Sequence, residues 1–292
     1  MSTVLVVGAT GHVGRPVARR LFADGHRVRV LVRDERRARE VLGDGFHYVP
    51  GLIQDREVVG RAVEGCDAVH ISVAGTSPAD MVAVEAVGTA AVATAAAAAG
   101  VGLLTYVSGN LVRHEYGPKL PEHRAKMVAE DALHACGVPY VIFRPTYFME
   151  NLPRHVQGRL ALTIGRPRPL HMVAAADFAA MVSRACDVTG IANQELVVFG
   201  PEPLTIQEAL RLYRDIVRPE LRCVTVPIPL MAAANRLLMG GKLTGPLQLM
   251  RLLERLGERG DPTIAQRQLG APTTTVQQWC QQRASLPARN VA

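Results

Sequence analysis

Short apolar runs alternate, through the first half of the chain, with longer segments whose apolar residues recur at helical spacing. The runs predict strands at residues 4–7, 27–32, 47–49, 68–72, 103–108 and 140–143. The segments between them predict helices over residues 11–23, 55–64, 79–99 and 121–135. Strands that alternate with helices form a parallel sheet covered on both faces. The predicted fold class is therefore α/β, a doubly wound parallel sheet of the Rossmann type.

The pattern changes beyond Pro145. Arg166-Pro167-Arg168-Pro169 is a stiff connector, and Asp177 is expected to cap a helix that runs to Cys186. Further on, the chain predicts strands at 195–199 and 222–227, a helix opening at a capping box at 205–208, and helices over 230–239 and 247–256. We expect residues 1–155 to form the nucleotide-binding domain. Residues 156–292 would form a smaller, mainly helical substrate lobe, partly interleaved with the core.

A glycine-rich turn follows the first strand, with the sequence Gly8-Ala9-Thr10-Gly11-His12-Val13-Gly14. Between a strand and a helix, with a second strand at the right distance, such a turn predicts a dinucleotide site. Gly8 would permit the tight turn, Gly11 would let the backbone approach a pyrophosphate, and Gly14 would allow close packing of helix on strand. The N–H groups at the helix start would face the phosphates.

The spacing of these glycines resembles that of the NmrA-like branch of the atypical short-chain dehydrogenase/reductase superfamily. Residues 137–145 and 148–151 also resemble that branch, which includes NADPH-dependent reductases, quinone reductases and NADP-sensing proteins without activity. With the glycine motif, the resemblance implies a set of cofactor contacts: Gly8, Thr10, Gly11, His12, Val13, Gly14, Arg33, Ile53, Ser72, Ala74, Lys126, Pro145 and Thr146.

Arg33, at the end of the second predicted strand, bears on which dinucleotide is bound. A carboxylate at this place holds the ribose of NAD, whereas an arginine would receive the 2′-phosphate of NADP. We therefore expect NADP(H) rather than NAD(H), with Arg36 and Arg37 either assisting or lying on a solvated helix face. Leu52 stands where the superfamily commonly has an aspartate that reaches the adenine, so apolar contact and backbone groups would hold the adenine here, with Gln54 as a possible substitute for the aspartate.

The predicted helix at 121–135 matches the superfamily helix that carries a Tyr-x-x-x-Lys pair, in which tyrosine donates the proton and lysine holds the ribose. Lys126 matches the lysine, but Glu122 occupies the tyrosine position. In one interpretation His123, next to Glu122, donates the proton beside a central Lys126. In a second, Glu122–Lys126 and Lys126–Glu130 are surface ion pairs. In a third, Lys126 holds the ribose of a cofactor that does not react.

Three other residues are candidates for the reaction. Ser108 ends the fifth predicted strand, where the superfamily serine stands, and is expected to touch substrate or nicotinamide. Tyr147 follows the loop that lies along the nicotinamide in relatives, and Tyr116 is a further possible proton donor. His114 and His155 have no supporting context and are interpreted as loop histidines. The predicted catalytic set is thus Lys126, His123, Ser108 and Tyr147.

Composition narrows the function. The chain has 292 residues, 48% of them hydrophobic, and a net charge of +7, without a nucleic-acid motif. Five scattered cysteines and nine histidines show no metal-binding spacing, so we expect neither a metal nor disulfides. The uncharged segment 86–104 is alanine-rich and interrupted by glycine, which favours a buried helix and strand over a membrane span. We expect a cytoplasmic monomer or homodimer with no membrane or nucleic-acid partner.

The preferred function is an NADP(H)-dependent oxidoreductase that moves hydride to or from a small organic substrate, such as a carbonyl, quinone or activated alkene. The alternative is a non-catalytic NADP-sensing regulator or assembly factor. A sugar-nucleotide epimerase fits less well, because that chemistry normally needs the missing tyrosine.

Overall fold

A computed structural model describes residues 1–285, which fall into two compact units. Unit 1 comprises Met1–Pro145, Ala175–Val198 and Asp261–Gly270. Unit 2 comprises Thr146–Ala174, Phe199–Gly260 and the residues from 271 on. The first boundary therefore lies ten residues before the expected one at residue 155, and two later segments of the chain return to unit 1.

Unit 1 is built on a seven-stranded parallel sheet with the strand order β11-β6-β5-β4-β1-β2-β3. The strands are β1 (Thr3–Val7), β2 (Arg27–Val32), β3 (His47–Pro50), β4 (Ala68–Ile71), β5 (Leu103–Val107), β6 (Tyr140–Pro145) and β11 (Gln194–Val198). This confirms the doubly wound fold class. The strand expected near residue 195 joins this sheet as its edge, paired with β6.

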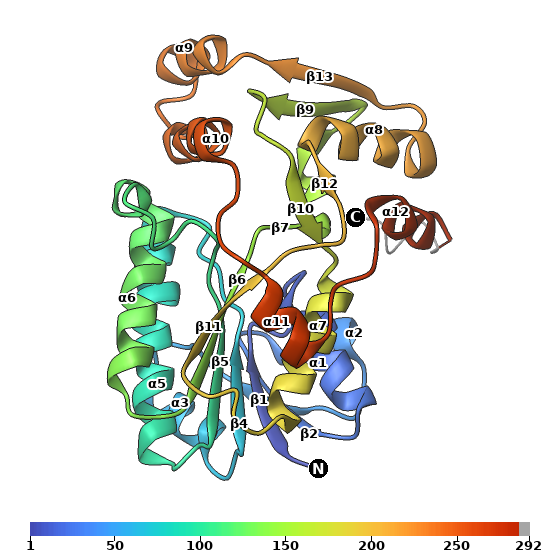
Figure 1. Cartoon of the computed structure of the whole chain (residues 1–292). Coiled ribbons are helices and arrows are strands. Elements are labelled where there is room, and N and C mark those ends of the chain that lie inside the picture. Colours follow the sequence, from blue (N-terminus) through green and yellow to red (C-terminus); the bar gives the residue numbers. More distant parts are fainter. Residues whose placement is uncertain (286–292) are drawn as a thin grey trace. The chain divides into compact units, whose positions relative to one another are not determined.

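Helices cover both faces of the sheet (Figure 1). One face carries α3 (Arg56–Val63), α5 (Thr89–Ala98) and α6 (Pro121–Ala135), and the other carries α1 (Gly14–Ala23) and α7 (Ala175–Asp187). Alternate residues of each strand point to opposite faces of the sheet. On the face covered by α3, α5 and α6, Leu5, Val69 and Leu104 pack with these helices in one buried cluster. Unit 1 also contains α2 (Glu35–Leu42), α4 (Pro78–Asp80), η1 (Met81–Gly88), η2 (Gly117–Lys119) and α11 (Thr263–Leu269).

Polar side chains set several helix starts. The Asp55 carboxylate accepts from the N–H groups of Glu57 and Val58, as expected for an N-cap. Thr205 and Glu208 form the expected capping box. Asp177 is not a cap, because α7 begins two residues earlier and Asp177 lies in its first turn.

Unit 2 is mainly helical, as expected, and also contains two small three-stranded sheets. Its strands are β7 (Tyr147–Phe148), β8 (Val156–Gln157), β9 (Leu160–Ile164), β10 (Leu170–Val173), β12 (Pro203–Leu204) and β13 (Arg222–Val226). Its helices are η3 (Met149–His155), α8 (Ile206–Val217), α9 (Ile228–Leu238), α10 (Thr244–Leu256) and α12 (Val276–Ala284). A buried cluster around Tyr213 and Trp279 joins α8 to α12.

Candidate functional site

The glycine turn between β1 and α1 has the geometry that its sequence predicts. Gly8 has φ +91°, and a Cβ there would stand 2.2 Å from the carbonyl oxygen of Ser72. A Cβ on Gly14 would stand 2.2 Å from the carbonyl oxygen of Gly8, so this glycine lets the helix pack on the strand end. Gly11 differs: its Cβ would make a single contact, a tight one at 3.3 Å from the carbonyl oxygen of Gly8, so the rest of that side of the turn is clear of protein beyond the chain neighbours.

The start of α1 is suited to an anion. Its N-cap residue Val13 supplies no side-chain hydrogen bond, and the first turn has no acidic residue. The positive end of the helix dipole is therefore not neutralised by a carboxylate in that turn, and it faces the cleared side of Gly11. These features fit the pyrophosphate of a dinucleotide.

Arg33 directly follows β2 and is exposed. It lies near the loop after β4: the pKa of Asp80 is lowered mainly by hydrogen bonds from Thr76 and Ser77, and the charge of Arg33 adds to this. Arg39 is engaged with Glu35 and Asp44, whereas Arg36 and Arg37 are exposed on the same helix, α2. An exposed arginine at this strand end suits a 2′-phosphate.

The other expected cofactor contacts divide between exposed and buried positions. Thr10, His12 and Ala74 are exposed and Ser72 is half-buried, all at the carboxyl ends of β1 and β4. Leu52, beyond β3, is 52% exposed, as an apolar contact for a ring would require. Ile53 is instead part of the buried core, where it would contact a side chain placed at Gly88.

Lys126 pairs with a residue that the sequence analysis did not single out, Glu85. Its Nζ lies 3.2 Å from Glu85 Oε2 and donates to the carbonyl oxygen of Val107 at 3.3 Å. The other oxygen of Glu85 accepts from the N–H of Gly75 at 2.8 Å. Glu85 thereby ties Lys126 to the loop beyond β4. It is the single charged residue between Asp80 and Arg113, and that isolation in an apolar segment was the signal available in the sequence.

Lys126 is held as a cation. Burial would lower its pKa, but the nearby Tyr106 and Glu85 outweigh burial and raise the pKa above its ordinary value. The ammonium also lies 5.5 Å from the centre of the Tyr106 ring. A permanently charged lysine can hold hydroxyl or phosphate oxygens but cannot act as a general base. The interpretation of Lys126 as one partner in surface pairs with Glu122 and Glu130 is wrong, because its ion pair is with the buried Glu85.

Glu122 and His123 have environments opposite to those expected. His123 is buried, and burial with the neighbouring Lys126 charge lowers its pKa to about 4. A histidine that is neutral at pH 7 is poorly suited to donate a proton, which argues against that role. Burial and the nearby Glu85 carboxylate raise the pKa of Glu122. Of the two residues, Glu122, in the tyrosine position, is therefore the one whose pKa shift makes it better suited to donate a proton.

Ser108 belongs to a buried ionic cluster. Its hydroxyl donates to Glu130, a fully buried carboxylate that also binds Arg113 and takes two hydrogen bonds from Arg144, at 2.8 and 3.1 Å. Arg144 in turn pairs with Glu195 on β11 at 2.6 Å. These bonds give Ser108 a structural environment and do not support the expectation that it touches the nicotinamide.

Tyr147 and His155, both in unit 2, form a pair. His155 Nδ1 lies 3.0 Å from the carbonyl oxygen of Leu162, an acceptor, so Nδ1 carries the proton. In the neutral ring Nε2 is therefore the acceptor, and the Tyr147 hydroxyl donates to it at 2.8 Å. Burial raises the pKa of Tyr147 and lowers that of His155. His155 is thus more than the loop histidine expected from sequence.

Thr146 and Pro145, two of the expected cofactor contacts, bond to the protein itself. Thr146 donates to the carbonyl oxygen of His171, and the carbonyl oxygen of Pro145 accepts from the backbone N–H of Asn110.

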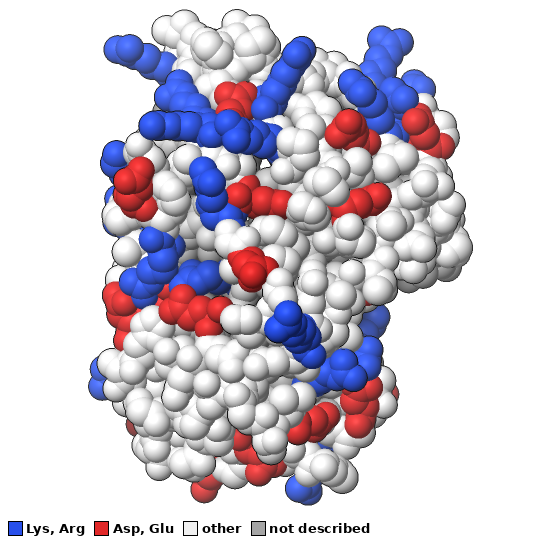
Figure 2. Space-filling model, viewed as in Figure 1, with Lys and Arg blue, Asp and Glu red and all other residues white. Residues whose placement is uncertain are grey.

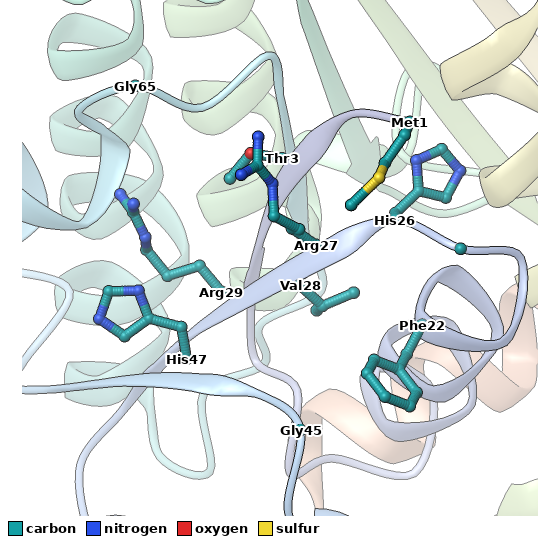
Figure 3. A pocket seen from close by; sticks show the side chains of 11 residues that line it. Met1, Thr3, Phe22, His26, Arg27, Val28, Arg29, Gly45, His47 and Gly65 are labelled. Carbon is teal, nitrogen blue, oxygen red and sulfur yellow. The ribbon is translucent and has the colours of Figure 1, made fainter.

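A cavity of about 660 Å³ lies in unit 1 by the amino ends of β1, β2 and β3, at the end of the strands opposite to the glycine turn (Figure 3). Arg29 contributes to its lining but is engaged with the carbonyl oxygens of Ala62 and Glu64. Ligands of open α/β sheets bind at the carboxyl ends of the strands. This cavity is therefore separate from the dinucleotide site.

The family model described as NAD(P)H-binding matches residues 8–188, from the glycine turn through α7. The chain belongs to this NAD(P)H-binding family. Family membership agrees with the atypical short-chain dehydrogenase/reductase resemblance carried by the glycine turn. The matched range includes the glycine turn, Arg33 and Lys126.

Relatives of this NAD(P)H-binding protein include reductases and an assembly factor. It is 36% identical, over 74% of each chain, to (4-alkanoyl-5-oxo-2,5-dihydrofuran-3-yl)methyl phosphate reductase of Streptomyces griseus. It is 27% identical, over 78% of this chain and 72% of the relative, to the photosystem II assembly factor Ycf39 of Synechocystis. The NADPH complex of the Escherichia coli NADPH-dependent quinone oxidoreductase QOR2 matches 96% of this chain and 99% of that one, with a TM-score of 0.77 and 19% identity, which supports the fold.

Among residues 1–285, no group of three or more His, Cys, Asp or Glu residues is placed to hold a metal ion, and all five cysteines are free. One helical stretch in this range, Pro78–Ala98, is long and apolar enough to cross a membrane by length and composition. Within this stretch Val92, Ala93 and Ala96 belong to the buried core of unit 1, and 39% of its apolar window is buried in the protein.

Proposed function

We propose that this protein is an NADPH-dependent reductase of a small organic substrate, either a carbonyl compound or an activated alkene. The observation that carries the proposal is the carboxyl edge of the sheet in unit 1. There, a glycine turn cleared for a pyrophosphate, an exposed Arg33 and a permanently charged Lys126 come from β1, β2 and α6. Together these suit the phosphates and a ribose of NADPH.

The relatives favour reduction. The Streptomyces griseus relative is named a reductase of an unsaturated ring that carries carbonyl groups, and it is 36% identical. Because that relative is named for a small-molecule substrate, we expect a small-molecule substrate for this protein as well. The cytoplasmic location and the monomeric or homodimeric state stay predictions.

NADPH supplies the hydride when it is bound, and the protein must supply a proton. Glu122 is our first candidate for the donor, since a carboxyl group whose pKa is raised can be protonated at the substrate's arrival. On transfer, the O–H bond of Glu122 breaks, a new bond to the substrate forms, and the carboxylate is left one helical turn from the Lys126 ammonium. Lys126 would stabilise that charge as well as hold the ribose.

Tyr147 is the second candidate, favoured by its bond to His155. When the substrate takes the Tyr147 proton, a phenolate is left, and its negative charge would need a proton or a cation nearby to stabilise it. His155, whose Nδ1 proton is fixed on Leu162, cannot supply a second proton while it is neutral. The raised pKa of Tyr147 likewise disfavours the phenolate. We therefore place Glu122 ahead of Tyr147.

The proposal is tested by measuring catalytic turnover. Purified protein with NADPH is tested, by loss of nicotinamide absorbance, against a panel of quinones, aldehydes, enones and unsaturated lactones. Saturable oxidation of NADPH that is lost in Lys126→Ala supports the proposal. Tight NADPH binding without turnover across the panel contradicts it and leaves the non-catalytic NADP-sensing function, which the similarity to the assembly factor Ycf39 favours.

A further inference from the structure

Helices α9 and α10 of unit 2, with the loop at 239–243 between them, carry an unusually exposed apolar surface. Leu237 is 79% exposed and Leu238 is 84% exposed, and Leu230 and Met239 are exposed as well. Leu230, Leu237 and Leu238 lie within one arc of α9, because residues seven and eight apart share a helix face. The helix buries just Ile228 and Asn235 within the protein. We call the surface formed by Leu230, Leu237, Leu238 and Met239 the apolar tip.

The charge around the apolar tip has one sign. No Asp or Glu occurs between Glu220 and Glu254, whereas Arg222, Arg236, Lys242 and Arg251 lie in that stretch. Arg236, Lys242 and Arg251 are exposed, and within residues 1–285 none of the three forms an ion pair. Glu254 is itself engaged by the N–H of Arg166. Figure 2 shows several Lys and Arg side chains, with an acidic side chain among them, around the part of unit 2 formed by α9 and α10, and uncharged surface at its end.

A cavity of about 460 Å³ lies between the two helices, and Arg236 and Arg251 line it with Gln248 and Thr244. Its floor is ordered: Asn235 is buried, accepts from the N–H of Leu243 at 2.9 Å and donates to Thr244 at 3.3 Å. Two guanidinium groups on a fixed concave surface are suited to the oxygens of a phosphate.

We propose that the α9–α10 pair docks this protein on a membrane surface that contains anionic phospholipid. Leu237, Leu238 and Met239 enter the boundary between headgroups and acyl chains, while Arg236 and Arg251 bind lipid phosphates. Charge complementarity favours this occupant: an apolar helix face whose own chain segment, residues 221–253, carries basic and no acidic residues has the pattern of an interfacial helix. The proposal departs from the expectation that the chain has no membrane partner, and it is independent of the proposed reductase activity.

The experiment is flotation of the full-length protein with vesicles of phosphatidylcholine, with or without phosphatidylglycerol, at low and high salt. We expect binding to the anionic vesicles alone, weakened by salt. The variant Arg236→Gln/Arg251→Gln should bind the anionic vesicles about thirtyfold more weakly, since two phosphate contacts are lost. Leu237→Ser/Leu238→Ser should weaken binding at least as much. All four positions are exposed, so the variants should fold, which circular dichroism checks.

Matched controls come from unit 1. Arg56→Gln/Arg61→Gln removes two exposed arginines of α3, and Ile264→Ser removes an apolar side chain that is 57% exposed on α11. Neither should change vesicle binding. The proposal is overturned if both vesicle types bind equally, if the α9–α10 variants bind like the wild type, or if Leu237→Ser/Leu238→Ser instead dissociates a dimer that ignores vesicles. Disabling NADPH binding with Gly11→Val should leave flotation intact, which separates this proposal from the reductase.

Discussion

At the scale of single residues, environment decides which member of a pair can do chemistry. Glu122 and His123 are neighbours in sequence, and the usual pKa of histidine makes His123 the natural choice for a proton donor at neutral pH. Burial reverses the choice, because it lowers the pKa of His123 to about 4 and raises that of Glu122. The position of the missing tyrosine therefore still holds a group that can carry a proton.

Replacing Glu122 by Gln should lower turnover by about 10²–10⁴-fold, because the proton donor is lost while the shape is kept. NADPH affinity, measured by isothermal titration calorimetry, should hardly change. His123→Gln is the comparison: it should retain most activity, and the wild-type pH–rate profile should have no limb between about pH 6 and 7 from this histidine. If His123→Gln is the inactive variant and Glu122→Gln the active one, the assignment is wrong.

Two glycines of the turn should respond differently to an added side chain. Gly14→Ala places a Cβ 2.2 Å from a backbone oxygen and should lower the melting temperature of the protein. In Gly11→Val the Cβ meets one backbone oxygen at 3.3 Å, so this variant should lower the melting temperature less than Gly14→Ala does and should abolish NADPH binding. Thermal denaturation with and without NADPH separates the two. An unchanged affinity in Gly11→Val would remove the pyrophosphate from this place.

At the scale of elements, α6 shows how tertiary structure redistributes a local pattern. Glu122, Lys126 and Glu130 are spaced for a ladder of ion pairs along one helix face. Each has instead a different environment, since Lys126 binds Glu85 of η1 and Glu130 binds Arg113 and Arg144. The helix thereby joins β5, β6 and η1 through buried charges, whose partners are far away in sequence.

Removing the Glu130 carboxylate, at the centre of this cluster, should lower the stability of the fold. Glu130→Ala leaves the buried Arg144 guanidinium without its main partner, so the free energy of unfolding should fall by about 3–5 kcal/mol. Asp131→Asn is the matched control, because this exposed carboxylate pairs with Arg113 alone and is worth about 1 kcal/mol or less. Urea denaturation measures both. Equal losses in the two variants would contradict the structural role of the Glu130 cluster.

The same cluster predicts a pH dependence. Burial would raise the pKa of Glu195, but Arg144 and His134 outweigh it and hold the pKa below the ordinary 4.5. A lowered folded-state pKa stabilises the fold above pH 4.5, and the stabilisation is lost as pH falls below that value. The melting temperature of the wild type should therefore drop on acidification, and Glu195→Gln should show a shallower drop. Parallel curves for the two proteins would refute this contribution.

At the scale of the whole molecule, sequence pattern predicted unit 1 far better than unit 2. Six strands and the glycine turn follow local periodicity, so they were found within a few residues. The association of β11 with β6 depends on contacts across more than 50 residues, and no local signal reports it. The family resemblance pointed to Lys126, whose role stays a prediction, whereas its partner Glu85 and the pairing of Tyr147 with His155 became visible only in the structure.

Cofactor choice should show in the stability of the entire chain. With Arg33 available for a 2′-phosphate, we expect NADPH to bind at least about tenfold tighter than NADH, or about 1.4 kcal/mol. At equal, near-saturating concentrations NADPH should then raise the melting temperature by about 3–5 °C more than NADH does. Arg33→Ser should bring the two shifts together. A larger shift with NADH in the wild type would exclude Arg33 from this role.

Glu85 has a consequence for the biogenesis of the protein as well. The stretch Pro78–Ala98, with a mean hydropathy of 1.6, satisfies the length and composition of a transmembrane segment. A charged side chain near the middle of such a segment costs roughly 2.5–3.5 kcal/mol when the translocon partitions it into lipid. Glu85 therefore biases the nascent chain toward release into water, before Lys126 has been synthesised. We expect Glu85→Ala to direct part of the newly made protein into the membrane fraction in a form that high salt does not release, unlike surface-bound protein.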